Sequence, residues 1–400
     1  MNIFKYLAFL PSITFGLFKK VEIFPWASLF IFSNKNFSFL VSNYLFFFFY
    51  ISFSSMYSIF YATNNDLDQN IFFETFRSIL AYLNPIIIFT YLLSCNSHEY
   101  KVFLRIAIKI FIFFIFLSIV QFIGFLENYN NILNFFVPRS SFLSEGIGGA
   151  RLLSSEPSRS SVEFFFLYII VFLILHFNNK KTLCLLSYIF FLCYQFIIFK
   201  SVDGFVITLI FGFLFYPFIM IPFSLLVGIF FIFSDNVLVP NRLIQFLTSL
   251  KDDYNISILL QSINDASGFR LSSIQSSINY GFNNLLGGGV GLWPLSSMEA
   301  YNEGYFHSSN TQYFKYHFNG EFSPARPASY IANIFLDFGL IGFFVFFMSL
   351  NYSIRNFITL YKLKFYLIFL ISLFFISSVG NPLYWISFAI ILRYKKVMDR

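Results

Sequence analysis

Two arginines and two glutamates stand within thirteen residues of one another, where the chain passes from a polar segment into an apolar one. They are Arg151, Glu156, Arg159 and Glu163. A guanidinium binds phosphate oxygens through paired N–H bonds, and a carboxylate can take a proton from a reacting hydroxyl group. Charges beside an apolar span are costly unless they are paired or face a wet cavity. We therefore interpret Arg151 and Glu156 as functional residues, and Arg159 and Glu163 as partners in structural pairing.

Part of this motif also has an explanation that involves no chemistry. Serine is a favoured N-cap residue, and a glutamate three positions later completes a capping box. Ser160 or Ser161 is therefore predicted to cap the apolar helix that follows, with Glu163 in its first turn.

A second group of candidate residues begins at Arg270. Apolar residues recur at helical spacing from Leu271 to Phe282, which predicts an amphipathic helix lying against the membrane or against other loops. A cation at the start of a helix is unfavourable for the helix dipole, so Arg270 is a candidate for binding an external anion. The glycine run at 287–291 lacks the preceding strand and the Lys-Ser/Thr pair of a phosphate-binding loop. We interpret it as a tight turn that allows close backbone approach.

The third group lies where the chain re-enters an apolar segment. Arg326 stands at the mouth of this segment, and Asp337 lies about two turns inside it. Gly339 and Gly342 are interpreted as positions of helix packing. His317, in the polar segment before Arg326, is a further candidate base beside Glu156, with a solvated histidine as the alternative.

Composition places these residues in a membrane protein. Hydrophobic residues make up 58% of the chain, charged residues only 11%, and mean hydropathy is +0.71, which excludes a water-soluble surface. The net charge of +7 comes from basic residues scattered between apolar segments, so it predicts no nucleic-acid partner. Three cysteines in or beside apolar segments form no metal or redox spacing, and we expect no metal and no cofactor.

The length of the apolar segments predicts an all-α polytopic integral membrane protein with about twelve transmembrane helices. They are expected at residues 3–18, 21–33, 37–61, 71–93, 103–126, 163–177, 183–199, 204–217, 219–234, 330–350, 365–378 and 381–394. Residues 1–234 thus contain the first nine helices and a polar loop at 127–163. Residues 235–329 form a large loop, and residues 330–400 contain the last three helices and a cytoplasmic C-terminus.

Orientation follows from the basic residues of alternate loops, because cytoplasmic loops retain lysine and arginine. One set of loops carries clusters of basic residues, at Lys101, Arg105, Lys109, Lys180, Lys181, Arg355, Lys362, Lys364, Arg393, Lys395, Lys396 and Arg400. The opposite set contains both large polar loops, and residues 235–329 have seven acidic and five basic residues. Both loops are therefore predicted to be periplasmic, in the inner membrane of a bacterium.

Taken together, these elements resemble the Wzy-type O-antigen polymerases, which join oligosaccharide repeat units. The resemblance rests on the Arg151 to Glu156-Pro157-Ser158 segment, the Gly268-Phe269-Arg270 helix with its glycine-rich turn, and the Ser329-Tyr330 to Gly342 re-entry. It covers most of the chain in span layout and loop placement. The related O-antigen ligases usually carry a histidine just before the last re-entrant helix, where this chain has Arg326-Pro327-Ala328-Ser329.

The resemblance implies a glycosyltransferase that acts on undecaprenyl-pyrophosphate-linked donor and acceptor glycans at the periplasmic face. Arg151, Arg270 and Arg326 would bind the lipid pyrophosphate that leaves, and Glu156 or His317 would activate the attacking hydroxyl. Membrane lipid and a chain-length regulator protein are the other partners it implies. Because pyrophosphate is already a good leaving group, the reaction does not demand a metal.

Three other functions remain open from the sequence. An O-antigen ligase would share the same layout. A polyprenyl-phosphate-sugar glycosyltransferase would use Asp66 and Asp68 as its acidic motif, although its large loop would not come late in the chain. A flippase for the lipid-linked repeat unit, which is not an enzyme, would also have about twelve spans but would need charges inside the bundle rather than a long outer loop.

Overall fold

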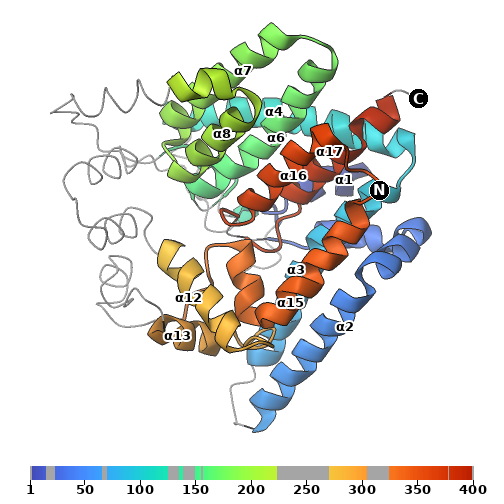
Figure 1. The fold of residues 1–400 in the computed structure, drawn as a ribbon, viewed down its shortest axis with the longest axis vertical. Helices are drawn as coiled ribbons and strands as arrows, with labels where there is room; N and C mark the ends of the chain where they lie inside the picture. Colours follow the sequence, from blue (N-terminus) through green and yellow to red (C-terminus); the bar gives the residue numbers. More distant parts are fainter. Residues whose placement is uncertain are drawn as a thin grey trace, which may run out of the picture.

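The computed structural model describes residues 2–14, 23–64, 70–124, 135–137, 149–154, 156–222, 270–303, 324–376 and 378–398. This part of the chain consists of helices and connecting turns, without a strand (Figure 1). Six of its helices are long and apolar enough to cross a membrane, at Asn36–Asn64, Ile71–Ser94, Ser97–Phe122, Pro157–Phe177, Lys181–Phe199 and Tyr330–Ile354. These helices confirm the all-helical prediction and support a multi-pass membrane protein.

The helices follow the apolar segments of the sequence closely in most places. The first half of the chain contains α1 (Asn2–Phe9), the 3₁₀ helix η1 (Trp26–Phe32), α2 (Asn34–Asn64), α3 (Asn70–Ser94) and α4 (Ser97–Phe122). The middle contains α6 (Pro157–Phe177), α7 (Lys181–Tyr194), the π-helical turn η3 (Gln195–Phe199) and α8 (Val202–Phe215). Then follow α12 (Arg270–Asn283), α13 (Trp293–Glu303), α15 (Tyr330–Ile354), α16 (Leu360–Ser372) and α17 (Leu383–Met398).

The first two predicted spans are not found as full-length helices in the described residues. The helix α1 has eight residues, a length of about 12 Å, and it ends just before Leu10-Pro11, where the proline ring disfavours helical backbone. The helix η1 has seven residues and is equally short. The predicted span at 219–234 lies almost entirely outside the described residues. Twelve spans are therefore not confirmed.

The bundle has a buried centre and one peripheral helix. The helix α6 is buried along most of its length, between α4, α8 and α17, whereas α2 lies at the edge of the bundle (Figure 1). The outer face of α2 exposes large apolar side chains, among them Phe46, Phe49 and Met56. An apolar face of this kind suits contact with lipid chains.

Charged side chains lie at both ends of the bundle. At one end, Arg393 donates to the backbone oxygen of Leu92, Lys362 donates to that of Leu392, and Lys5 pairs with Glu99. At the other end lie the first turns of α6, α8, α12, α15 and α17, which follow or interrupt the polar segments of the sequence. The basic loops of the predicted topology and the candidate site residues thus lie at opposite ends.

The helix α15 is broken at Gly339, which has φ 63° and ψ −165°. Backbone N–H groups of the glycine-rich turn bond to the carbonyls freed by the break, from Gly288 to Leu336 at 2.8 Å and from Gly289 to Asp337 at 3.1 Å. In return, the N–H of Ile341 donates to the oxygen of Leu285 at 3.1 Å. The prediction of a tight turn with close backbone approach is confirmed. Gly339, in contrast, is the residue at which the helix is interrupted, rather than a simple packing position.

The helix predicted after Arg270 is present as α12, and it packs against α15 through its small residues. Serines at 272, 273, 276 and 277 are buried together with Tyr280 and Gly281, and a Cβ added at Gly281 would collide with Phe335. The predicted apolar face points elsewhere, since Phe282 is exposed and Ile274 and Ile278 are only half-buried. The small residues form the contact with α15 because they let two helix backbones approach closely.

Candidate functional site

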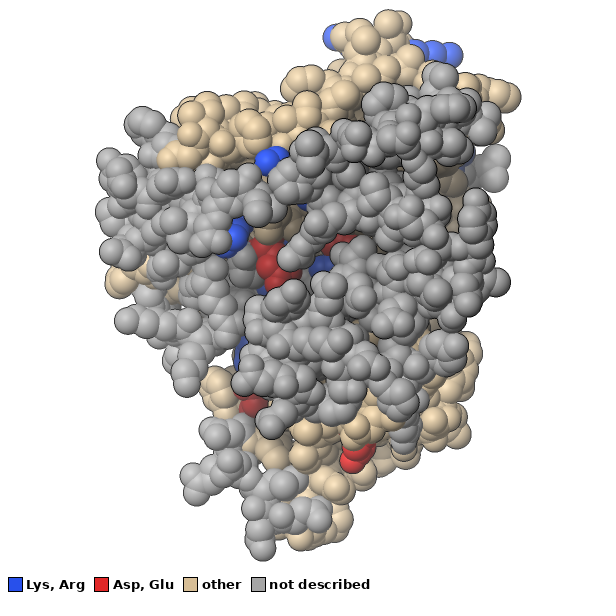
Figure 2. Space-filling model, turned by 90° about the vertical axis from the view of Figure 1, so that its left-hand side faces the viewer, with Lys and Arg blue, Asp and Glu red and all other residues tan. Residues whose placement is uncertain are grey.

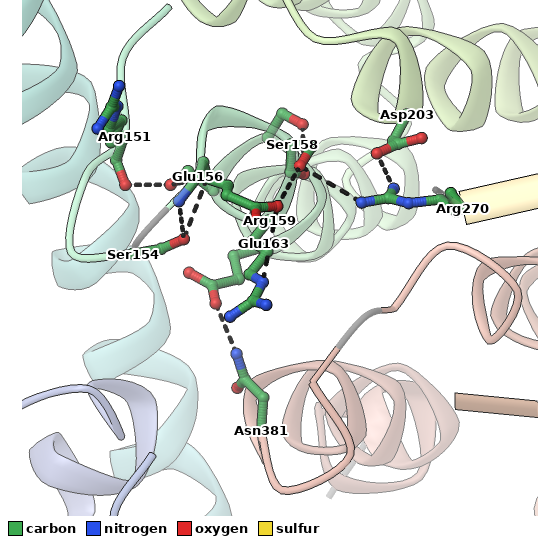
Figure 3. Close-up of polar contacts among 11 residues, drawn as sticks. Arg151, Ser154, Glu156, Ser158, Arg159, Glu163, Asp203, Arg270 and Asn381 are labelled. Carbon is green, nitrogen blue, oxygen red and sulfur yellow. Dashed lines mark hydrogen bonds and ion pairs between the residues drawn. The ribbon is translucent and has the colours of Figure 1, made fainter. Parts of the chain in front are cut away.

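The candidate site is built around the first turn of α6 (Figure 3). Glu156 is the N-cap residue of this helix and Pro157 its first residue, a position where the missing N–H of proline costs nothing. The helix therefore begins earlier than predicted, and neither Ser160 nor Ser161 is its cap. The Ser161 hydroxyl instead donates to Ser201 at 2.9 Å, and Glu163 lies in the second turn.

The segment that carries Arg151 is held by a glutamine at the end of α4. The Oε1 atom of Gln121 accepts the N–H groups of Arg151 at 3.1 Å and Leu152 at 2.7 Å. Its Nε2 atom donates to the oxygen of Leu152 at 2.9 Å. A further bond joins the N–H of Ala150 to the oxygen of Ile198, within the π-helical turn η3, at 2.9 Å. Together these bonds fix the chain just before α6, including Leu152 with its positive φ of 48°.

Replacing Gln121 with leucine is expected to lower the thermal stability of the protein. The change leaves two buried backbone N–H groups and one carbonyl without their partner, and each such loss costs about 1–3 kcal/mol. A melting curve of the purified protein in detergent measures the effect. Gln275→Leu is the control, because the buried Oε1 atom of Gln275 has no hydrogen-bond partner in the described structure. Equal melting temperatures for the two variants would contradict this role of Gln121.

Arg270, the first residue of α12, binds side chains from two other helix starts. Its guanidinium pairs with the carboxylate of Asp203 in the first turn of α8, and it reaches the hydroxyl of Ser158 in α6 at 3.4 Å. Both members of the ion pair are 14% exposed. Burial lowers the pKa of Arg270 to about 10, with the charge of Glu156 acting in the opposite direction. The guanidinium therefore remains charged at neutral pH.

The two glutamates of the motif have different surroundings. The side chain of Glu156 is 53% exposed, its Oε2 atom lies 3.9 Å from Nε of Arg159, and it accepts a hydrogen bond from Ser158 at 3.3 Å. Glu163 is buried, and its Oε1 atom accepts a 2.6 Å hydrogen bond from Nδ2 of Asn381. The prediction that Arg159 takes part in ion pairing agrees with the structure. Its partner by distance is Glu156.

Arg326 belongs to a second polar cluster, formed by α3, α13 and α15. Its guanidinium donates to the hydroxyl of Ser78 and lies over the ring of Trp293, 5.4 Å from the centroid. Deeper in the bundle, the Tyr82 hydroxyl donates to the buried carboxylate of Asp337 at 2.7 Å. The segment of Arg326 touches α12 through the N–H of Ala328 and the hydroxyl of Ser273, at 3.4 Å.

The structure thus brings together only some of the residues predicted from the sequence. Glu156 and Arg270 share the start of α6, whereas Arg151 lies on the other side of that turn (Figure 3). Arg326 stands in the neighbouring cluster. His317, Asp66 and Asp68 fall outside the described residues.

Sequence reasoning missed Asp203 and Asn381, which hold Arg270 and Glu163. The signal that could have found them is the position of each polar residue directly before or in the first turn of an apolar span. Acidic and basic side chains gather near the middle of one face of the molecule (Figure 2). Among the described residues, no group of His, Cys, Asp and Glu side chains could hold a metal ion. The described arrangement suits the binding of an anion beside a carboxylate.

Comparisons of the chain with protein-family models, with curated proteins and with solved structures found no match.

Proposed function

We propose that this protein is a membrane glycosyltransferase that joins repeat units carried by undecaprenyl pyrophosphate, as an O-antigen polymerase does. The observation that carries the proposal is the placement of Arg270. This buried guanidinium joins the starts of α6, α8 and α12 and lies beside the exposed carboxylate of Glu156. A group that binds the leaving anion and a group that accepts a proton are the two features that such a transfer requires at one place.

The starts of these helices strengthen the attraction for an anion. The N-terminal end of a helix carries a partial positive charge and N–H groups without partners in the helix, so it favours phosphate groups. Three helices present this end around Arg270, and α17 presents its own through Asn381 beside Glu163. In the proposed reaction, the sugar hydroxyl attacks the donor anomeric carbon while the lipid pyrophosphate departs toward Arg270.

The placement of the other arginines refines the expectation from the sequence. Arg151 lies on the other side of the first turn of α6, and Arg326 lies in the neighbouring cluster with Ser78 and Trp293 (Figure 3). The proposed contact with the leaving pyrophosphate therefore belongs to Arg270 first. Arg326 and Trp293 stand at the mouth of the same end of the bundle and suit contact with the glycan or with a second lipid-linked substrate.

The proposed reaction would take place at the periplasmic side of the membrane. The end of the bundle that carries Arg270 would face the periplasm, and the opposite end with Arg393 and Lys362 would face the cytoplasm of a bacterium. Donor and acceptor would both arrive as undecaprenyl-pyrophosphate-linked glycans within the membrane. A chain-length regulator protein would act on the product from outside this chain.

A reconstitution experiment tests this function. The full-length protein in liposomes, supplied with an undecaprenyl-pyrophosphate-linked oligosaccharide, is expected to form a ladder of longer products on a gel. One undecaprenyl pyrophosphate is released for each linkage formed. Product that appears only when a lipid core acceptor is added would identify a ligase instead. Movement of the oligosaccharide across the bilayer without any longer product would identify a flippase.

A further inference from the structure

Glu163 is a buried carboxylate for which the sequence suggested only structural pairing. No ion pair to it occurs in the described part of the chain, although Arg159 lies one helical turn before it. Its side chain is held from one side only, through the 2.6 Å hydrogen bond from Asn381 to Oε1. A buried charge without a salt bridge is costly at membrane depth, which makes it a candidate for function.

Asn381 fixes the direction of this carboxylate. The Oδ1 atom of Asn381 accepts the N–H of Leu383 at 3.0 Å, so its amide nitrogen must be the atom that faces Glu163. Asn381 thereby links Glu163 to the start of α17, whose partial positive charge favours the ionised carboxylate. The Oε2 atom accepts no hydrogen bond in the described structure and is left available.

The surroundings of Glu163 also contain the groups of the proposed phosphate site. Tyr384 of α17 lies within electrostatic reach of Glu163, Arg159 and Arg270. From α8, Asp203 faces the site through its ion pair with Arg270. The Glu163 carboxylate and the Arg270 guanidinium therefore both lie near the start of α6, at the end of the bundle where the proposed transfer takes place (Figure 3).

We infer that Glu163, rather than Glu156, accepts the proton of the attacking sugar hydroxyl, an inference that rests on the proposed function. Glu156 is half-exposed, and its Oε2 atom is turned toward the guanidinium of Arg159, so water and Arg159 compete with a substrate for its carboxylate. Glu163 is shielded from water and oriented by a neutral amide. With Oε1 held by Asn381, Oε2 is the oxygen that would take the proton of a hydroxyl group bound beside it.

The proposed step forms one glycosidic bond and breaks one bond to pyrophosphate. The hydroxyl oxygen of the acceptor sugar forms a bond to the anomeric carbon of the donor, and the bond from that carbon to the pyrophosphate oxygen breaks. The pyrophosphate keeps the electron pair and leaves as an anion beside Arg270. The hydroxyl proton moves to Oε2 of Glu163 and passes later to solvent, which restores the carboxylate.

The test is Glu163→Gln in the full-length protein, reconstituted in liposomes with the lipid-linked oligosaccharide. The glutamine keeps the size of the side chain and an oxygen for Asn381 but cannot accept the proton. The rate of linkage formation is expected to fall by about 10²–10⁴-fold. The rate is divided by the amount of protein that binds undecaprenyl pyrophosphate, so a loss of folded protein does not enter the comparison.

Two further variants and a pH profile complete the test. Glu299→Gln on α13 is the matched control and is expected to keep the wild-type rate, and Glu156→Gln is expected to lose far less than Glu163→Gln. The acidic limb of the pH–rate profile should be present in the wild type and absent in Glu163→Gln. A Glu163→Gln rate within tenfold of a polymerising wild type would overturn the inference and leave the proposed function standing. A wild type that forms no polymer would overturn the function itself.

Discussion

Replacing Arg270 with alanine is expected to abolish polymer formation. The leaving pyrophosphate loses the guanidinium that stabilises its charge, and removal of one such donor slows a reaction by about 10²–10³-fold. The variant also leaves Asp203 as a buried carboxylate without its partner, which costs about 3–5 kcal/mol of folding free energy. Product ladders and protein amount in the membrane are measured together. Arg270→Lys should recover only part of the rate, because lysine keeps the charge but loses the planar fork.

A double variant separates chemistry from stability in this prediction. Arg270→Ala combined with Asp203→Ala removes both charges, so it should restore the amount of folded protein without restoring polymer. Lys396→Ala at the opposite end of the bundle, where the exposed lysine lies over Phe357, is expected to leave the product ladder unchanged. A normal ladder from the Arg270→Ala protein would remove the pyrophosphate contact from the proposal.

Replacing Gly339 with alanine is expected to be the most destabilising single change in α15. Its backbone, with φ 63° and ψ −165°, lies in a region that only glycine populates readily, and the strain of another residue there costs about 1–3 kcal/mol. An added Cβ would also stand 2.4 Å from the oxygen of Asn284 and from the nitrogen of Gly287. The turn would have to move away, and its bonds to the broken helix would be lost.

Thermal unfolding in detergent measures this effect. Gly380→Ala is the matched control, because Gly380 does not have a positive φ and its Cβ would come no closer than 3.3 Å to Ala81. The control should unfold near the wild-type temperature, and Gly339→Ala well below it. Two variants with the same melting temperature would show that the break in α15 can be rebuilt without glycine.

The helical framework could be predicted because long apolar segments leave the backbone no other way to satisfy its hydrogen bonds in a membrane. The spans at 71–93 and 330–350 correspond to α3 and α15 within a few residues. Full-length spans at 3–18 and 21–33 were predicted but not found, because apolar composition alone does not show that Pro11 ends α1 after two turns. The face of α12 that packs against α15 could not be predicted either, since a row of serines is polar in the sequence but packs like other small residues.

The candidate site could be predicted only in its individual residues. Arg270 and Glu156 stood out because their charges lie beside apolar segments, but Asp203 lies 67 residues before Arg270 in the chain and offers no local signal of their contact. Glu163 and Asn381 are 218 residues apart. Periodicity and capping rules describe neighbours along one helix. They do not predict which helix starts are neighbours in space. For this reason the sequence could not show that Arg326 and Arg270 belong to different clusters.

The break in α15 ties membrane insertion to the order in which the chain is made. A continuous helix carries its own hydrogen bonds into the bilayer, but the carbonyls of Leu336 and Asp337 take theirs from Gly288 and Gly289. The glycine-rich turn leaves the ribosome before α15 does, so its donors already exist when the broken helix enters the membrane. A chain shortened to begin after the turn would have to insert α15 while these carbonyl groups lack hydrogen-bond partners. Such a fragment should be retained by the quality control of the cell rather than complement a separately made N-terminal part.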